Sequence, residues 1–232
     1  MRAMAARKKT PTFKQFQGFP KEGLEFLKEL EKNNKREWFV ANKARYEEHV
    51  LAHLKAVVEE GEKAYGNGKN FRIHRDVRFS KDKTPSKTHA SAVFERKGIV
   101  HYLHIEKDHM FAATGCYQMA KDQLARFYEA IDDDKSGKRL EKLVADAEKA
   151  GLEVGGSALK TAPRGYAKDH TRIALLRHKG LTTSRQYKAG TWMHGPELAK
   201  RMVKTFAEGE AINEWLRKHV GESAEGKRFV KN

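Results

Sequence analysis

Strand-like segments of this chain are concentrated in one central stretch, and helix-like segments lie on both sides of it. Within residues 91–118, SAVFERKG, IVHYLHIEKD and MFAATGCYQ follow one another, with Gly98 between the first two. Short apolar runs divided by turn residues are typical of antiparallel strands. Because strands and helices do not alternate in a βαβα order, the predicted fold class is α+β. We expect a central, mostly antiparallel sheet flanked by helices from both ends of the chain.

The spacing of apolar residues predicts where the helices lie. Leu24, Leu27 and Leu30 recur at roughly helical intervals after Pro20. Asn34, with Glu37 three residues later, predicts the capped start of a second helix. The predicted helices cover residues 20–32, 35–65, 119–131, 138–150, 169–179 and 196–219. Further strand segments are predicted within 152–166 and over 181–190.

Length and cysteine content restrict the organisation of the chain. Its 232 residues are enough for one α+β domain, predicted over 15–221, between a disordered basic tail at 1–14 and a flexible tail at 222–232. No apolar run approaches the roughly 18 residues of a membrane helix, so no membrane partner is expected. The single cysteine, Cys116, excludes an intrachain disulfide, and we expect it to be a small core residue. A reducing cytoplasm is the expected location.

The positive charge of the chain is clustered. With 47 Lys and Arg against 31 Asp and Glu, the net charge is +16. Almost all of the excess lies in three blocks, residues 1–21, 71–88 and 160–204. Clustering of this kind indicates an anionic partner, which can be nucleic acid, a phosphorylated small molecule or an acidic surface.

The most unusual stretch is FRIHRDVRFSKDKTPSK, residues 71–87, which holds six cations and two acids. The alternation predicts a strand, with Phe71, Ile73, Val77 and Phe79 turned inward, together with Arg75. The opposite face would carry Arg72, His74, Asp76, Arg78 and Ser80. Asp76 can pair with His74 or Arg78, and Arg75 needs an acid such as Asp82.

Two interpretations of this polar face remain open. It can be a structural ion-pair ladder on a solvated sheet. Alternatively, the acids orient guanidinium groups that bind a phosphate or carboxylate. In the second case Arg72, Arg75, Arg78 and Lys83 are the candidate ligand-binding residues. No catalytic residue can be assigned, and the candidates are Asp76, Asp82 and Lys83.

The same stretch resembles the signature of a mostly bacterial family known as domain of unknown function 2461. The family pattern is Arg-x-x-Arg-Asp-x-Arg-Phe-x-x-x-Asp/Asn-Lys-x-x-Tyr. The residues that match it are Arg72, Arg75, Asp76, Arg78, Phe79, Asp82 and Lys83. Ser86 stands where the family has Tyr, so a ligand contact by that phenol is not carried over. NNKREWFVANKARYEEHV and PRGY are also similar to the family, and the resemblance covers about residues 16–220. It implies membership and no particular reaction.

Outside this stretch, a predicted loop offers two further candidate ligand-binding residues. Arg164 and Tyr166 follow Pro163 in a predicted loop, where they can contact an anion or simply form a surface turn. Asp169 is predicted to cap the helix that follows.

The histidines do not show the spacing of a metal site. His49 and His53 lack the glutamate of a zinc protease helix, and His101 and His104 fall on opposite faces of one strand. Convergence of His74 with His104 is a weak alternative. No metal and no cofactor are therefore predicted.

Three functional hypotheses follow from the sequence. The first is a small-molecule binding site or an enzyme active site at the arginine-rich stretch, with an anionic, phosphate-bearing ligand. The second is a nucleic-acid-binding accessory protein that uses the basic tail and residues 160–204. The third is an ion-pair motif without a ligand. The oligomeric state is not predicted.

Overall fold

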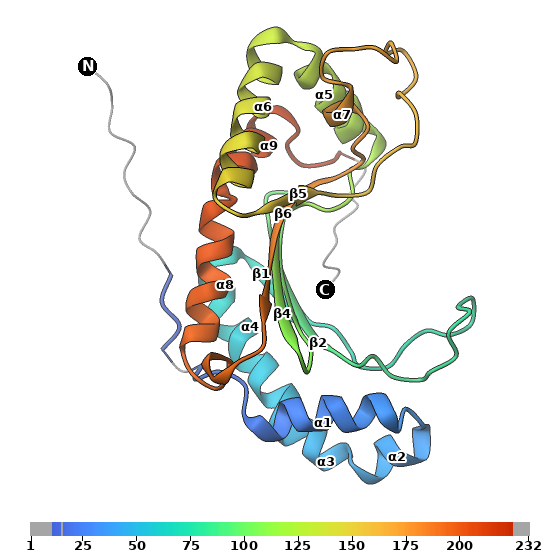
Figure 1. Cartoon of the computed structure of the whole chain (residues 1–232), viewed down its shortest axis with the longest axis vertical. Helices are drawn as coiled ribbons and strands as arrows, with labels where there is room; N and C mark the ends of the chain where they lie inside the picture. The colour runs from blue at the N-terminus through green and yellow to red at the C-terminus, as the bar shows by residue number, and fades with distance from the viewer. Residues whose placement is uncertain (1–10, 15, 225–232) are drawn as a thin grey trace.

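The protein has an α+β fold, as predicted, built on an antiparallel sheet (Figure 1). The computed structural model describes residues 11–14 and 16–224. Within these residues the sheet has six strands in the order β1-β2-β3-β4-β6-β5. The strands are β1 (Asn67–Asn70), β2 (Ala90–Arg96), β3 (Ile99–Ile105), β4 (His109–Cys116), β5 (Glu153–Gly155) and β6 (Leu181–Lys188). The β2–β3 turn has positive φ at Lys97 (52°) and Gly98 (73°), the backbone of a tight hairpin.

The helices gather at the two ends of the sheet and along one of its sides (Figure 1). They are α1 (Lys21–Lys32), α2 (Arg36–Ala41), α3 (Lys43–Tyr46), the π-helical turn η1 (Glu47–Leu51), α4 (Ala52–Tyr65), α5 (Lys121–Asp132), α6 (Asp134–Lys149), α7 (Ile173–Leu176), the 3₁₀ turn η2 (Thr191–His194), α8 (Glu197–Glu208) and α9 (Glu210–His219). Helix α4 packs on β1 and β2, while α8 and α9 pack on β4.

Strand register divides the sheet into two faces. Phe94 pairs with His101, His101 with Thr114, and Thr114 with Thr183. This row contacts α4, α8 and α9, and we call its side the covered face. The opposite side, the open face, has its own row in which Ser91 pairs with His104 and His104 with Phe111. Alternation along each strand keeps the two sets apart.

Two hydrophobic clusters hold the helices to the sheet. The larger one joins α1, α4 and α8 to the covered face through fully buried side chains such as Phe26, Leu103 and Phe206. The second joins α5, α6 and α9 to one end of the sheet and includes Cys116 and Trp215. Cys116 is 5% exposed, and burial raises the pKa of its thiol to about 12. The prediction that it is a core residue is therefore confirmed.

Most predicted helices are present, but their boundaries differ. The helix predicted over 35–65 is divided into α2, α3, η1 and α4, and the one over 196–219 is divided at Gly209. A Cβ on Gly209 would stand 2.2 Å from the Thr183 hydroxyl oxygen, so the α8–α9 junction needs a glycine to reach the sheet. Asp133 alone separates α5 from α6, and its carboxylate caps α6 by accepting the Ser136 N–H.

The helix predicted over 169–179 is wrong, because only Ile173–Leu176 is helical. The surrounding turns are positioned by Arg172, whose buried side chain reaches the end of α5. Asp169 is exposed and caps nothing; instead His170 Nδ1 accepts the Arg172 N–H at 3.0 Å. Tertiary contacts therefore replaced the helix that the local sequence favours.

The chain ends extend along the body of the protein where they are described. Phe13, within the predicted N-terminal tail, packs against the larger cluster. Asp122 accepts hydrogen bonds from Ser223 and Ala224, at the start of the predicted C-terminal tail. The remainder of both predicted tails, residues 1–10 and 225–232, lies outside the described residues. None of the helices in the described ranges has the length and apolar character needed to cross a lipid bilayer.

Candidate functional site

The arginine-rich stretch forms an irregular loop, not the predicted strand. We call residues 71–88, between β1 and β2, the arginine loop; it extends away from the end of the sheet (Figure 1). Its base is held by backbone hydrogen bonds from Lys87 to Ile73 (2.8 Å) and from Arg75 to Pro85 (2.9 Å). Among the described residues of this loop, the only isolated β-bridge pairs His74 with Ser86.

The predicted alternation holds in the first half of the loop and then fails. Ile73 is 4% exposed, and Arg72 and His74 on the other side are exposed. Phe79, predicted to face inward, is 97% exposed. The chain turns at residues 78–79, so no strand continues to carry the pattern. An apolar side chain at this turn has no sheet face to pack on.

The acids of the loop are paired with its arginines, as the sequence predicts. Asp76 accepts two hydrogen bonds from the Arg78 guanidinium, at 2.9 Å from Nε and 2.6 Å from Nη2, and a third from the Arg78 backbone N–H at 3.3 Å. Arg75 forms an ion pair with Asp82. The Arg78 hydrogen bond lowers the pKa of Asp76, and hydrogen bonds from Thr84, with a smaller effect of Arg75, lower the pKa of Asp82.

The candidate catalytic residues therefore contribute to the shape of the loop. Both carboxylates are bound to neighbouring side chains. The ammonium group of Lys83 donates to the Val77 carbonyl at 2.9 Å. Asp76, Asp82 and Lys83 do not line the pocket described below.

Asn34 has a role that its position before a helix did not suggest. Its amide nitrogen donates to the Ser86 carbonyl at 2.8 Å, and its oxygen accepts the Ser86 N–H at 3.0 Å. The cap of α2 is instead Lys35, without a side-chain bond, so the predicted capping role of Asn34 is wrong. Ser86 is 1% exposed. The Asn34–Ser86 pair thus fastens the arginine loop to the α1–α2 connection.

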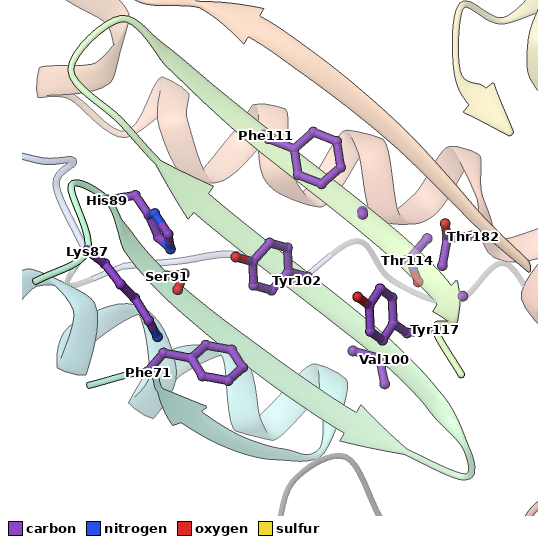
Figure 2. A pocket seen from close by; sticks show the side chains of 12 residues that line it. Phe71, Lys87, His89, Ser91, Val100, Tyr102, Phe111, Thr114, Tyr117 and Thr182 are labelled. Atoms are coloured by element: carbon purple, nitrogen blue, oxygen red, sulfur yellow. The ribbon is translucent and has the colours of Figure 1, made fainter. Parts of the chain in front are cut away.

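A pocket of about 320 Å³ lies on the open face, beside the base of the arginine loop (Figure 2). Figure 2 shows Lys87, His89 and Ser91 at one end, Tyr117 and Thr182 at the other, and Tyr102 between them. The residues that line it are Phe71, Lys87, His89, Ser91, Val100, Tyr102, Phe111, Ala113, Thr114, Gly115, Tyr117 and Thr182. Aromatic rings and one lysine dominate this set, which contains no carboxylate.

Lys87 is the positively charged group of the pocket. Its Nζ lies 5.2 Å from the centre of the Phe71 ring. Burial lowers the pKa of Lys87, and the charges of Arg72 and Arg75 lower it further. Within residues 11–14 and 16–224, neither Lys87 nor Arg72 forms a salt bridge. Three cations therefore share the region at the base of the loop, and Arg75 alone has an acidic partner there.

Next to Lys87 the structure brings together three side chains whose spacing in the sequence does not predict a common site. His89 precedes β2, His104 lies in β3, and Glu106 follows β3. The Glu106 Oε1 atom is 3.0 Å from His104 Nε2 and 4.0 Å from His89 Nδ1. Burial lowers the pKa of both histidines, that of His89 to about 4, and the neighbouring His104 and Lys87 contribute to the shift of His89.

A signal for this group is present in the sequence. His104 and Glu106 are two residues apart and so share a face of one strand. His89 joins them because β2 and β3 pair with Ala90 opposite Ile105, which places the preceding His89 beside Glu106. The alternative partner that the sequence offers for His104 is His74. The His74 ring packs on Phe39 at 4.9 Å.

The other sequence candidates do not join this site. Arg164 is exposed, and Tyr166 packs edge-on against Tyr128 at 5.8 Å, in the helical cluster around α5. This loop and the arginine loop lie toward opposite ends of the sheet (Figure 1). Neither Arg164 nor Tyr166 lines the pocket.

The basic block at residues 160–204 does not form one surface. Arg172 is 6% exposed and forms an ion pair with Asp134. The guanidinium of Arg201 stacks 4.2 Å from the Trp192 ring, and Arg185 donates to backbone carbonyls and an acid. The loop near α7 and helix α8 lie in different parts of the molecule (Figure 1). Several of these cations therefore stabilise the fold.

The fold and the pocket define an α+β protein with one sheet face covered by helices and the other bearing a basic, aromatic pocket. The chain belongs to the family described as conserved hypothetical protein DUF2461, whose model matches residues 22–215. The family membership expected from the sequence is thereby confirmed. No curated protein matches the sequence.

Proposed function

We propose that the open-face pocket binds a small organic anion, with a phosphate or carboxylate at Lys87 and an apolar body over the aromatic residues. The observation that carries this proposal is the composition of the lining, which combines one lysine with four aromatic rings and lacks acids. Small-molecule sites are usually apolar cavities with a few polar groups that orient the ligand. An anion is favoured because Lys87 is the positively charged side chain of this lining and no Asp or Glu in the lining balances its charge.

The arginine loop supports the same ligand class. Arg72 and Arg75 are close enough to depress the pKa of Lys87 by repulsion. An anion bound there would relieve that repulsion. The hydroxyls of Ser91 and Tyr102 add hydrogen-bonding groups to the lining. In this proposal the arginine loop supplies positive potential, and its ion pairs with Asp76 and Asp82 maintain its shape.

The proposed setting is the cytoplasm. Cys116 is the single cysteine of the chain, and buried free thiols are common in reducing compartments.

Binding of phenyl phosphate, measured by calorimetry, tests the proposal. Inorganic phosphate and phenol serve as the two halves of the probe. We expect phenyl phosphate to bind more tightly than either half. Lys87→Ala should weaken it about tenfold or more, because a hydrogen bond to a charged group contributes about 1.5–3 kcal/mol. Lys142→Ala is the matched control, since Lys142 lies on α6 with a side chain that is 67% exposed.

Two results would contradict the proposal. One is equal binding of phenyl phosphate by the parent protein and the Lys87→Ala variant. The other is tight binding of random duplex DNA that competes with phenyl phosphate and weakens steeply with salt, which would favour a nucleic-acid ligand.

A further inference from the structure

Three potential metal ligands converge where the open face meets the arginine loop. His89, His104 and Glu106 each offer a ligand atom, and these atoms lie within 4.8 Å of one another. The two imidazole rings are stacked with centroids 4.2 Å apart. The three side chains are 22%, 16% and 30% exposed, in that order. They come from two neighbouring strand ends, so the positions of their backbones are set by the sheet.

A second contact orients one of the rings. The Tyr102 hydroxyl oxygen lies 3.1 Å from His104 Nδ1, on the opposite side of the ring from Glu106. In the tautomer that donates Nδ1–H to Tyr102, the Nε2 lone pair points toward Glu106. Nε2 and the carboxylate oxygen are then two electron-pair donors 3.0 Å apart. Histidine ligands in metal sites are oriented in this way by a hydrogen bond from their other ring nitrogen.

We infer that His89, His104 and Glu106 form a binding site for a divalent first-row transition metal ion, with Zn²⁺ as the probe ion. Two imidazoles and one carboxylate are a ligand set that zinc and non-haem iron sites use, with further coordination positions left open. Imidazole nitrogen disfavours Mg²⁺ and Ca²⁺, which select oxygen ligands. This inference goes beyond the proposed function and does not rest on it.

The spacing of the ligand atoms is compatible with this ion. Ligands about 2.0–2.1 Å from a tetrahedral Zn²⁺ are about 3.3 Å from one another. The two distances to Glu106, 3.0 Å and 4.0 Å, lie on either side of that value. His109 stacks on His104 with ring centroids 5.7 Å apart and is the nearest additional imidazole of the described region. It lies beside Glu106, whose N–H donates to the His109 carbonyl at 2.9 Å.

The position of the site connects it to the pocket. His89 belongs both to the three ligands and to the residues that line the pocket. A metal ion held by His89 would therefore lie at the edge of the pocket that carries Lys87. An anionic ligand in the pocket would then be close to two kinds of positive charge.

The test uses the full chain without a polyhistidine tag. Zn²⁺ affinity is measured by competition with a chromophoric chelator, and the amount of metal retained after desalting by mass spectrometry. We expect one Zn²⁺ per chain, and Co²⁺ should give a visible spectrum that Mg²⁺ does not alter. His104→Gln, His89→Gln and Glu106→Gln should each weaken Zn²⁺ binding by about 100-fold or more, since loss of an outer-shell partner alone costs about 10–100-fold.

The matched control is His49→Gln. His49 also stands next to a glutamate, with its Nε2 3.9 Å from Glu48, but on the surface of η1. The His49→Gln variant should bind Zn²⁺ with the same affinity as the parent protein. Circular dichroism of each variant checks folding, and three separate ligand variants keep the test valid if one of them misfolds. Retention of parental affinity by His104→Gln and His89→Gln, or absence of stoichiometric Zn²⁺ in the parent, would overturn the inference.

The same set of variants separates this inference from the proposed function. Lys87→Ala should leave Zn²⁺ affinity within a few fold of the parent. A variant that loses phenyl phosphate binding and keeps Zn²⁺ binding therefore reports on the role of Lys87 alone. A variant that loses Zn²⁺ binding and keeps phenyl phosphate binding reports on His89, His104 and Glu106 alone.

Discussion

Two histidines three residues apart on β3 have opposite environments. His101, on the covered face, is 5% exposed, and its ring packs between Tyr65 and Phe206 with centroids 4.7 Å and 4.9 Å away. His104, on the open face, has a polar partner on either side of its ring, Tyr102 and Glu106, and lies beside the pocket.

Strand β3 therefore contributes to the packed core with one face and to the candidate site with the other. The Nδ1 atom of His101 is satisfied inside the protein by the Thr114 hydroxyl at 2.8 Å, which in turn accepts from Asn213 of α9. Helices α4, α8 and α9 pack over this side of the sheet. On the open face, His104 lies beside the pocket, and its side chain is 16% exposed. Predictions below test whether the two faces differ in this way.

The largest expected effect is the loss of packing on the covered face. Phe206 is 1% exposed and contacts both Tyr65 and His101. Phe206→Ala should lower the free energy of unfolding by about 3–5 kcal/mol, because it removes apolar contacts and leaves a cavity. Phe111→Ala on the open face should cost only about 1 kcal/mol. Urea unfolding monitored by fluorescence measures both, and equal losses would show that the open face is packed like a core.

The second effect is a loss of stability in acid that originates at His101. Burial lowers the pKa of His101 from 6.5 to about 4; Arg217 and Arg96 add to the shift, and Glu210 opposes it. Above pH 6.5 the imidazole is neutral in both states and the contribution is complete. As the pH falls from 6.5 to 4 the unfolded chain binds a proton that the folded chain resists. The resulting loss is about 3 kcal/mol.

Unfolding curves between pH 7 and 4 test this prediction. The His101→Gln variant keeps a group able to bond with Thr114. Over this pH range its free energy of unfolding should fall by about 3 kcal/mol less than that of the parent. A direct NMR titration provides the second measurement. A ring of His101 that titrates at its ordinary value of about 6.5 would contradict the expected burial effect.

The smallest effect is expected in the arginine loop. Asp76 is 45% exposed, and its partner Arg78 is 77% exposed, so their ion pair is screened by solvent. Asp76→Ala should therefore leave the urea midpoint unchanged within error. A large destabilisation would instead indicate that the pair belongs to a buried network.

The fold class could be predicted because the sequence carries the two relevant periodicities. Gly98 marks the β2–β3 hairpin, and the helical spacing of Leu24, Leu27 and Leu30 marks α1. The errors occurred where distant contacts decide local structure. Residues 71–79 have a strand-like alternation, but Asn34 and the loop's own ion pairs hold them as a loop.

The candidate site was predicted less completely than the fold. Arg72 and Arg75, which the sequence offers as candidate ligand-binding residues, do not line the pocket but are close enough to Lys87 to lower its pKa. Lys87 was noticed only as one cation among six, because its position beside Phe71 depends on how the loop returns to the sheet. His89, His104 and Glu106 are separated by up to 17 positions in the chain, and no spacing rule joins them.

The sequence by itself determined the α+β class and most of its helices and strands, that Cys116 is a core thiol, and that Arg75 and Arg78 would pair with nearby acids. These properties depend on neighbours within a few residues, where periodicity and charge act directly. Only the tertiary structure decided which face of β3 is covered and which side chains meet on the open face. Strand register and the helices that pack on one side set those contacts, and both depend on residues far apart in the chain.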